Sequence, residues 1–182
     1  METYGSSFKT IRIIIIKLTD RPKYSLIEFE RRWLVKKDMI PDISVLEKIL
    51  ITDKYFPDTR MRLREMTNTQ EGETVYKLTK KYGKITDSSE PLTTIYLSQA
   101  EFDLFNRLDG YGLKKTLYRF PYSGNIFLIE FFSFPITDLI LAEAESQSEK
   151  ELSQLILPDF ISKEITTDKN YEGYSIASGL RS

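Results

Sequence analysis

Residues 24–35, YSLIEFERRWLV, carry the most regular pattern in the chain, because large apolar and charged side chains alternate along them. One face of the extended segment holds Ile27, Phe29, Trp33 and Val35, with Arg31 as an exception. The opposite face holds Glu28, Glu30, Arg32 and Leu34. Successive side chains of a strand point to opposite sides of a sheet, so the segment is predicted to be a strand with a buried apolar face. Its acidic face then lies either in bulk solvent or inside a barrel.

Alternation or β-branched composition predicts further strands along most of the chain. They cover residues 8–18, 49–56, 60–66, 74–82, 92–97, 113–120, 126–132 and 139–145. Short helices are expected at 41–48, at 98–108 and from 148 to about 158, the last two beginning with Ser-x-x-Glu capping boxes. Residues from 165 onward are expected to form an irregular polar tail. Because strands dominate and mostly follow hairpin order, the predicted fold class is mainly β (α+β), an antiparallel sheet or barrel with peripheral helices.

The composition excludes several kinds of chemistry. Histidine and cysteine are both absent from the 182 residues, and 26 Lys+Arg balance 27 Asp+Glu. No imidazole base or thiol nucleophile is available, and a metal held by side chains must be a hard cation such as magnesium, manganese or calcium. The near-neutral charge argues against a nucleic-acid partner. The aliphatic run at residues 13–16 is too short for a membrane span or a signal peptide, so one cytoplasmic domain over residues 1–182 is expected.

Charge at every second residue marks three of the predicted strands. These positions are Glu28 and Glu30, then Arg60, Arg62 and Arg64, then Glu143 and Glu145. On a single strand the pattern is typical of a solvated sheet face. In a closed barrel, however, acidic and basic strands could face each other across a polar lumen. The acids could then bind a divalent ion, while arginines and lysines such as Lys80 and Lys115 could bind phosphate. No glycine-rich nucleotide fingerprint is present, so side chains would have to hold the phosphate.

Seven segments in order over residues 24–177 resemble the CYTH family, the triphosphate tunnel metalloenzymes, and leave residues 1–22 as an N-terminal extension. IEFERRWLV resembles the E-x-E-x-K signature, and DKYF with RLRE resembles the aromatic and R-x-R strands. YKLTKK resembles the strand with a phosphate-binding lysine, LKKTLYRF the K-x-R strand, and IFLIEFF a strand with an inward acid. LAEAE resembles the paired glutamates, and LPDFISKEITTDKNYEGYSIA resembles the closing segment. The resemblance implies a closed eight-stranded antiparallel β-barrel, or tunnel, with a polar charged lumen and a few peripheral short helices.

The resemblance also implies divalent-metal-dependent hydrolysis of a small triphosphate, most simply inorganic tripolyphosphate, with Mg²⁺ or Mn²⁺ as cofactor. It assigns metal binding to Glu28, Glu30, Glu130, Glu143 and Glu145. It assigns phosphate binding to Arg62, Arg64, Lys80 and Lys115. Arg32 and Tyr55 are its candidate catalytic residues, because they match a lysine and tyrosine that are proposed to activate water in some members. Arg119 is expected to bind phosphate as a partial substitute for the arginine of the K-x-R strand, because it lies two residues after the matching position and on the same face.

Two departures from the family pattern leave other functions open. Arg32 stands in place of the signature lysine, and arginine stays protonated and cannot act as a base. Leu117 stands where the K-x-R strand has its arginine. A catalytically weakened protein that binds polyphosphate or a nucleotide is therefore an alternative, as is an enzyme like the class IV adenylate cyclases. Both a monomer and a homodimer are compatible with the sequence.

Overall fold

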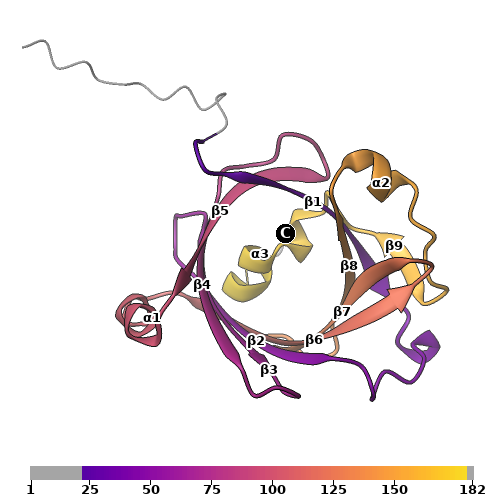
Figure 1. Ribbon diagram of the computed structural model, residues 1–182, viewed down its shortest axis with the longest axis horizontal. Coiled ribbons are helices and arrows are strands. Elements are labelled where there is room, and N and C mark those ends of the chain that lie inside the picture. The colour runs from indigo at the N-terminus through magenta and orange to yellow at the C-terminus, as the bar shows by residue number, and fades with distance from the viewer. Residues whose placement is uncertain (1–21, 180–182) are drawn as a thin grey trace, which may run out of the picture.

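Eight antiparallel strands form a closed barrel in the computed structural model, which describes residues 22–179 (Figure 1). In chain order they are β1 (Leu26–Val35), β2 (Lys48–Tyr55), β3 (Met61–Asn68), β4 (Thr74–Lys81), β5 (Ser89–Leu97), β6 (Tyr111–Tyr122), β7 (Asn125–Phe134) and β8 (Ile140–Ser146). The order around the barrel is β5-β4-β3-β2-β6-β7-β8-β1, and pairing between β1 and β5 closes the ring. A ninth strand, β9 (Ile161–Glu164), pairs with the second half of β1. The predicted fold class is therefore confirmed.

Much of the hydrophobic core lies between the outer barrel face and the segments that cover it. Trp33 is 1% exposed and packs with Phe127 and Ala144, as the alternation in β1 predicts. Helix α1 (Gln99–Asn106) places Phe102 against Leu63 and Leu78 on β3 and β4. The short helix α2 (Glu149–Ser153) contacts β1 and β8. Apolar burial outside the barrel leaves the inner face of these strands available for polar side chains.

Local sequence signals explain how several elements begin and end. The Ser98 hydroxyl accepts from the Glu101 N–H, and the Glu101 carboxylate accepts from the Ser98 N–H, which confirms the predicted capping box of α1. Between β6 and β7, Ser123 and Gly124 both have positive φ, the conformation of a tight hairpin turn. Within residues 22–179, no helix is long and apolar enough to cross a membrane.

The helix predicted at residues 41–48 is wrong. A single 3-10 turn, η1 (Lys37–Met39), precedes this segment, which is irregular up to the start of β2. The Asp42 carboxylate accepts from the Ser44 N–H two residues on. Such a local bond offers the backbone an alternative to a helix, so Asp42 forms a turn instead of a helix cap. The predicted strand at residues 8–18 lies outside the described residues.

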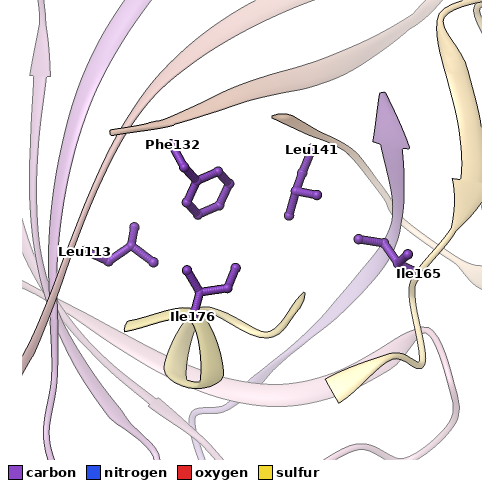
Figure 2. Close-up of a cluster of buried hydrophobic side chains, with 5 residues drawn as sticks. All are labelled: Leu113, Phe132, Leu141, Ile165 and Ile176. Carbon is purple, nitrogen blue, oxygen red and sulfur yellow. The ribbon is translucent and has the colours of Figure 1, made fainter. Parts of the chain in front are cut away.

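The irregular tail predicted from residue 165 is also wrong, because part of it folds into the barrel opening. After the 3-10 turn η2 (Lys169–Tyr171), helix α3 (Gly173–Ser178) contacts β2 and β6, and it appears within the ring in Figure 1. Figure 2 shows Ile176 of α3 pointing toward the other side chains of a buried apolar cluster. That cluster consists of Leu113, Phe132, Leu141, Ile165 and Ile176. The lumen is therefore polar along only part of its length.

Strand pairing places this apolar cluster on the inner face. Leu113 pairs with Asp53, and Phe132 pairs with Lys115. Directly paired residues of antiparallel strands project from the same side of the sheet. Lys115 lines the cavity inside the barrel, as do Leu113, Phe132 and Ile176 themselves, so the cluster lies in the interior where α3 covers it.

Ile176→Ala is expected to destabilise the protein by about 3 kcal/mol, because a fully buried side chain would be replaced by a cavity. Urea unfolding should show a lower midpoint with an unchanged slope. Ile156→Ala is the matched control, since Ile156 is 61% exposed, and it should change stability by less than about 0.5 kcal/mol. Equal stability of the two variants would show that α3 does not depend on this contact.

Candidate active site in the barrel lumen

A cavity of about 590 Å³ occupies the barrel, and charged residues from opposite strands line it. Its charged lining includes Glu28, Glu30, Arg32, Arg62, Arg64, Lys81, Lys115, Glu130, Glu143 and Glu145. In the ring of eight strands, β3 lies four strands from β8, and β2 lies four strands from β1. The arginines of β3 therefore face the glutamates of β8 across the lumen. We call β1 and β8 the acidic wall, and β2, β3, β4 and β6 the basic wall.

Three carboxylates of the acidic wall lie close enough to share one cation. Glu28, Glu30 and Glu145 each place an oxygen within 4.8 Å of the others. Burial, followed by the charge of Glu143, raises the pKa of Glu30 to about 8. Burial and the charge of Glu28 also raise the pKa of Glu145. Carboxylates that repel in this way favour a bound cation, and an all-oxygen donor set suits Mg²⁺ or Mn²⁺.

Lys81, and not the predicted Lys80, projects into the cavity. The Lys81 ammonium lies 2.8 Å from a Glu28 oxygen and 3.4 Å from a Glu90 oxygen. Burial opposes its charge, but Glu28 and Glu30 outweigh burial and raise the pKa of Lys81. Lys80 is on the opposite face of β4, the face on which Leu78 packs beneath α1. The predicted residue Lys80 therefore does not line the cavity, because in a strand a shift of one residue exchanges inside for outside.

Lys81→Ala is expected to weaken tripolyphosphate binding by about tenfold or more, because a partly buried ammonium that can contact phosphate is lost. Lys80→Ala removes the same charge from the other face of the same strand and should change binding by less than about twofold. Calorimetric titration of both variants distinguishes the two positions. A larger loss in Lys80→Ala than in Lys81→Ala would contradict the orientation of β4.

The basic wall contains a buried acid that the sequence did not single out. The Asp53 carboxylate accepts from Arg64 Nε at 2.6 Å and from Arg64 Nη2 at 2.7 Å. Arg62 Nε lies 3.9 Å from the same carboxylate. Burial would raise the pKa of Asp53, but Arg64 and Arg62 outweigh burial and lower it. A signal was available, because Asp53 precedes Tyr55 by two residues and must share its face of the strand.

Glu130 belongs to an ion pair and not to the group of three carboxylates. It accepts a hydrogen bond from Lys115, and both side chains are buried. Burial opposes the charge of Lys115, but Glu130 and Glu143 outweigh burial and raise its pKa. Burial and the charge of Glu143 raise the pKa of Glu130 to about 7. In the described part of the chain, Glu130 Oε2 has no hydrogen-bond partner. The predicted metal ligand and the predicted phosphate ligand thus contact each other.

The two candidate catalytic residues both line the cavity. Arg32 donates from Nη1 to the carbonyl of Tyr171 at 2.8 Å, and its Nε lies 3.0 Å from a Glu30 oxygen. Burial opposes its charge, but Glu30 and Glu143 outweigh burial and raise the pKa of Arg32, so it stays a cation. The Tyr55 hydroxyl lies where a Cβ on Gly173 would clash, so glycine allows α3 to begin against the ring.

Arg119 lies away from the cavity, contrary to its predicted role. Its guanidinium pairs with Glu47 at 3.1 Å, and its side chain is 48% exposed. Leu117, two residues earlier, is buried and does not line the cavity either. Arg119 therefore does not substitute for the arginine that Leu117 replaces.

Comparison with solved structures supports the tunnel architecture. No family model and no curated protein matches the sequence. A crystal structure of NE1496, described as an inorganic triphosphatase, matches 85% of this chain and 97% of its own, with 23% identity and a TM-score of 0.55. A second crystal structure of NE1496 gives 25% identity over 82% and 97%, with the same TM-score. A Bacillus halodurans protein, named as a candidate adenylate cyclase, matches 71% of this chain and 86% of its own, with 16% identity and a TM-score of 0.50. The chain has the tunnel fold of the CYTH proteins, as the order of its motifs indicated.

Proposed function

We propose that the protein is a divalent-metal-dependent hydrolase of a small triphosphate, and that inorganic tripolyphosphate is its substrate. The observation that carries this proposal is one cavity with an acidic wall facing a basic wall. A metal–polyphosphate complex has the complementary division of charge, since its cation suits the acidic wall and its phosphates suit the basic wall. The name of NE1496, an inorganic triphosphatase with the same fold, supports this activity and substrate.

The acidic wall supplies the metal ligands in this proposal. Glu28, Glu30 and Glu145 hold Mg²⁺ or Mn²⁺, and Glu143 adds negative charge beside them. When bound, the ion neutralises phosphate oxygens and lowers the pKa of a water molecule. Arg32 remains protonated, so its role is to balance the acids and to bind phosphate, and not to remove a proton.

The basic wall binds the phosphates. Arg62, Arg64, Lys81 and Lys115 all line the cavity. Charged donors fixed in a partly buried site orient a phosphoryl chain and stabilise the negative charge that develops on the leaving phosphate. These residues are distributed over β3, β4 and β6, so they can contact successive phosphates of a substrate that is phosphate throughout.

A binding protein with little turnover is the second candidate function. The specific observation in its favour is Arg32, which contacts Glu30 and the carbonyl of Tyr171. It stands in place of a lysine, which could release a proton, whereas arginine does not. Under this alternative, tripolyphosphate binds tightly without hydrolysis, and Arg32→Lys raises the rate.

Release of phosphate from tripolyphosphate and from ATP tests the proposal. The assay is run with Mg²⁺, with Mn²⁺ and with a chelator. Metal-dependent turnover of tripolyphosphate supports a triphosphatase, whereas binding without turnover supports the second candidate. Conversion of ATP to cyclic AMP would instead establish a cyclase. If the protein binds no triphosphate under any condition, both candidates are wrong.

A further inference from the structure

We propose that Asp53 is a positioning residue, which holds the guanidinium of Arg64, and through its charge that of Arg62, in the orientation that binds substrate phosphate. The inference deepens the proposed function and rests on it. Asp53 lies on β2, which is four strands from β1 in the ring and therefore opposite the carboxylates proposed to hold the metal.

Asp53 contacts Arg64 through both carboxylate oxygens. The two bonds, 2.6 and 2.7 Å long, join the carboxylate to the Nε and Nη2 edge of the guanidinium. Two parallel bonds between planar groups fix the orientation of both planes. The side chain of Asp53 has no exposed surface, and that of Arg64 is 14% exposed. With one edge of Arg64 held by Asp53, Nη1 on the other edge remains available to a ligand in the cavity that Arg64 lines.

The neighbouring arginine shows an unused donor. Arg62 Nε is buried and has no hydrogen-bond partner within residues 22–179, although it lies 3.9 Å from Asp53. Buried polar atoms in folded proteins are normally hydrogen-bonded, so the guanidinium of Arg62, which lines the cavity, has an unsatisfied donor that a small shift could direct to a ligand. A phosphate oxygen is the acceptor that a guanidinium prefers in such a position.

The carboxylate of Asp53 reduces the repulsion among the neighbouring cations, and it orients their guanidinium groups before substrate binds. Arg62 and Arg64 lie two residues apart on one strand, and Lys115 also acts on Asp53 electrostatically. Without an anion among them, three partly buried cations repel each other and turn apart. Asp53 offsets one of these charges and Glu130 pairs with Lys115, which leaves the charge of Arg62 to attract phosphate. Donors oriented before the substrate arrives do not have to be ordered during binding, which strengthens binding and transition-state stabilisation.

A double-mutant cycle with Arg64 tests this role. Asp53→Asn keeps the shape of the side chain but replaces one accepting oxygen by an N–H donor that faces the guanidinium. It is expected to lower kcat/KM for tripolyphosphate by about tenfold or more, mainly through KM. In an Arg64→Ala background the same change should lower kcat/KM by less than about twofold, because the group that Asp53 orients is absent. Glu47→Gln is the control, since Glu47 also pairs with an arginine but lies away from the cavity.

The outcomes separate this inference from the proposed function. Equal losses in both backgrounds, or unchanged kinetics of Asp53→Asn, would overturn the positioning role while the triphosphatase assignment stands. If the unaltered protein shows no turnover, the cycle is measured as tripolyphosphate affinity by calorimetry, with the same expected ratios. If Asp53→Asn does not fold, Arg64→Lys decides, because lysine keeps the charge but cannot make the paired bonds. A KM for Arg64→Lys equal to that of the unaltered protein would overturn the inference, and absence of any polyphosphate binding would overturn both.

Discussion

Glu145→Gln is expected to lower the rate of magnesium-dependent tripolyphosphate hydrolysis by about a hundredfold or more. Glu145 is one of the three carboxylates whose oxygens lie within 4.8 Å of one another, and it is the most exposed of the three. Its replacement removes the charge of a proposed metal ligand without leaving a buried unpaired group. Activity should therefore fall while the melting temperature of the metal-free protein stays within a few degrees.

Glu73→Gln is the matched control for this variant. Glu73 is exposed and lies in the turn between β3 and β4, away from the cavity. Phosphate release should be measured for both variants over a range of magnesium concentrations. Loss of activity in Glu145→Gln that higher magnesium partly restores would support a metal ligand. Full activity at low magnesium would show that Glu145 does not bind the ion.

Glu30→Gln is expected to act on stability and activity in opposite directions. Each unit of pKa shift corresponds to about 1.4 kcal/mol, and Glu30 has a pKa of about 8 in the folded, metal-free protein. Removing its charge should stabilise the metal-free protein at pH 8 by about 2 kcal/mol, less than the whole shift because a partly buried amide also has a desolvation cost. The same change should abolish most metal-dependent activity, because a proposed ligand is lost.

The pH dependence gives the sign of this effect. An ordinary glutamate has a pKa of 4.5, so between pH 4.5 and 8 the folded protein binds more protons at Glu30 than the unfolded chain does. Raising the pH through this window therefore removes stability from the unaltered protein, and glutamine at position 30 does not titrate. Chemical unfolding in chelator at pH 4 and pH 8 measures the difference. A variant less stable than the unaltered protein at pH 8 would contradict the electrostatic strain at Glu30.

The strands and the acidic wall could be predicted from the sequence, because their patterns are local. The alternation around Trp33 requires one buried face, and the same spacing places Glu28 and Glu30 together on the other face. The capping box at Ser98 is also contained within four residues. What these patterns leave open is whether the second face meets solvent or a lumen. The order of motifs over the chain resolved that question, and the strand pairing confirms it.

The missed details depend on contacts that a local pattern does not contain. Lys80 and Lys81 are adjacent and chemically identical, so the lysine pair itself does not show which one faces inward. Leu78 shares a face with Lys80, and its packing beneath α1 places Lys80 outside. Asp53 gains its importance from Arg64 on the neighbouring strand. The helix α3 spans six residues, too few to show a helical period, and much of its anchoring comes from Ile176.

The most direct test of the two facing walls is to locate the ion and the substrate together. Crystals of the protein soaked with Mn²⁺ and tripolyphosphate would identify manganese by its anomalous scattering. The expected result is a manganese site bound by Glu28, Glu30 and Glu145, with phosphate density extending from it toward Arg62, Arg64 and Lys81. Manganese and phosphate bound outside the barrel, with the lumen free of both, would contradict a triphosphate site between an acidic and a basic wall.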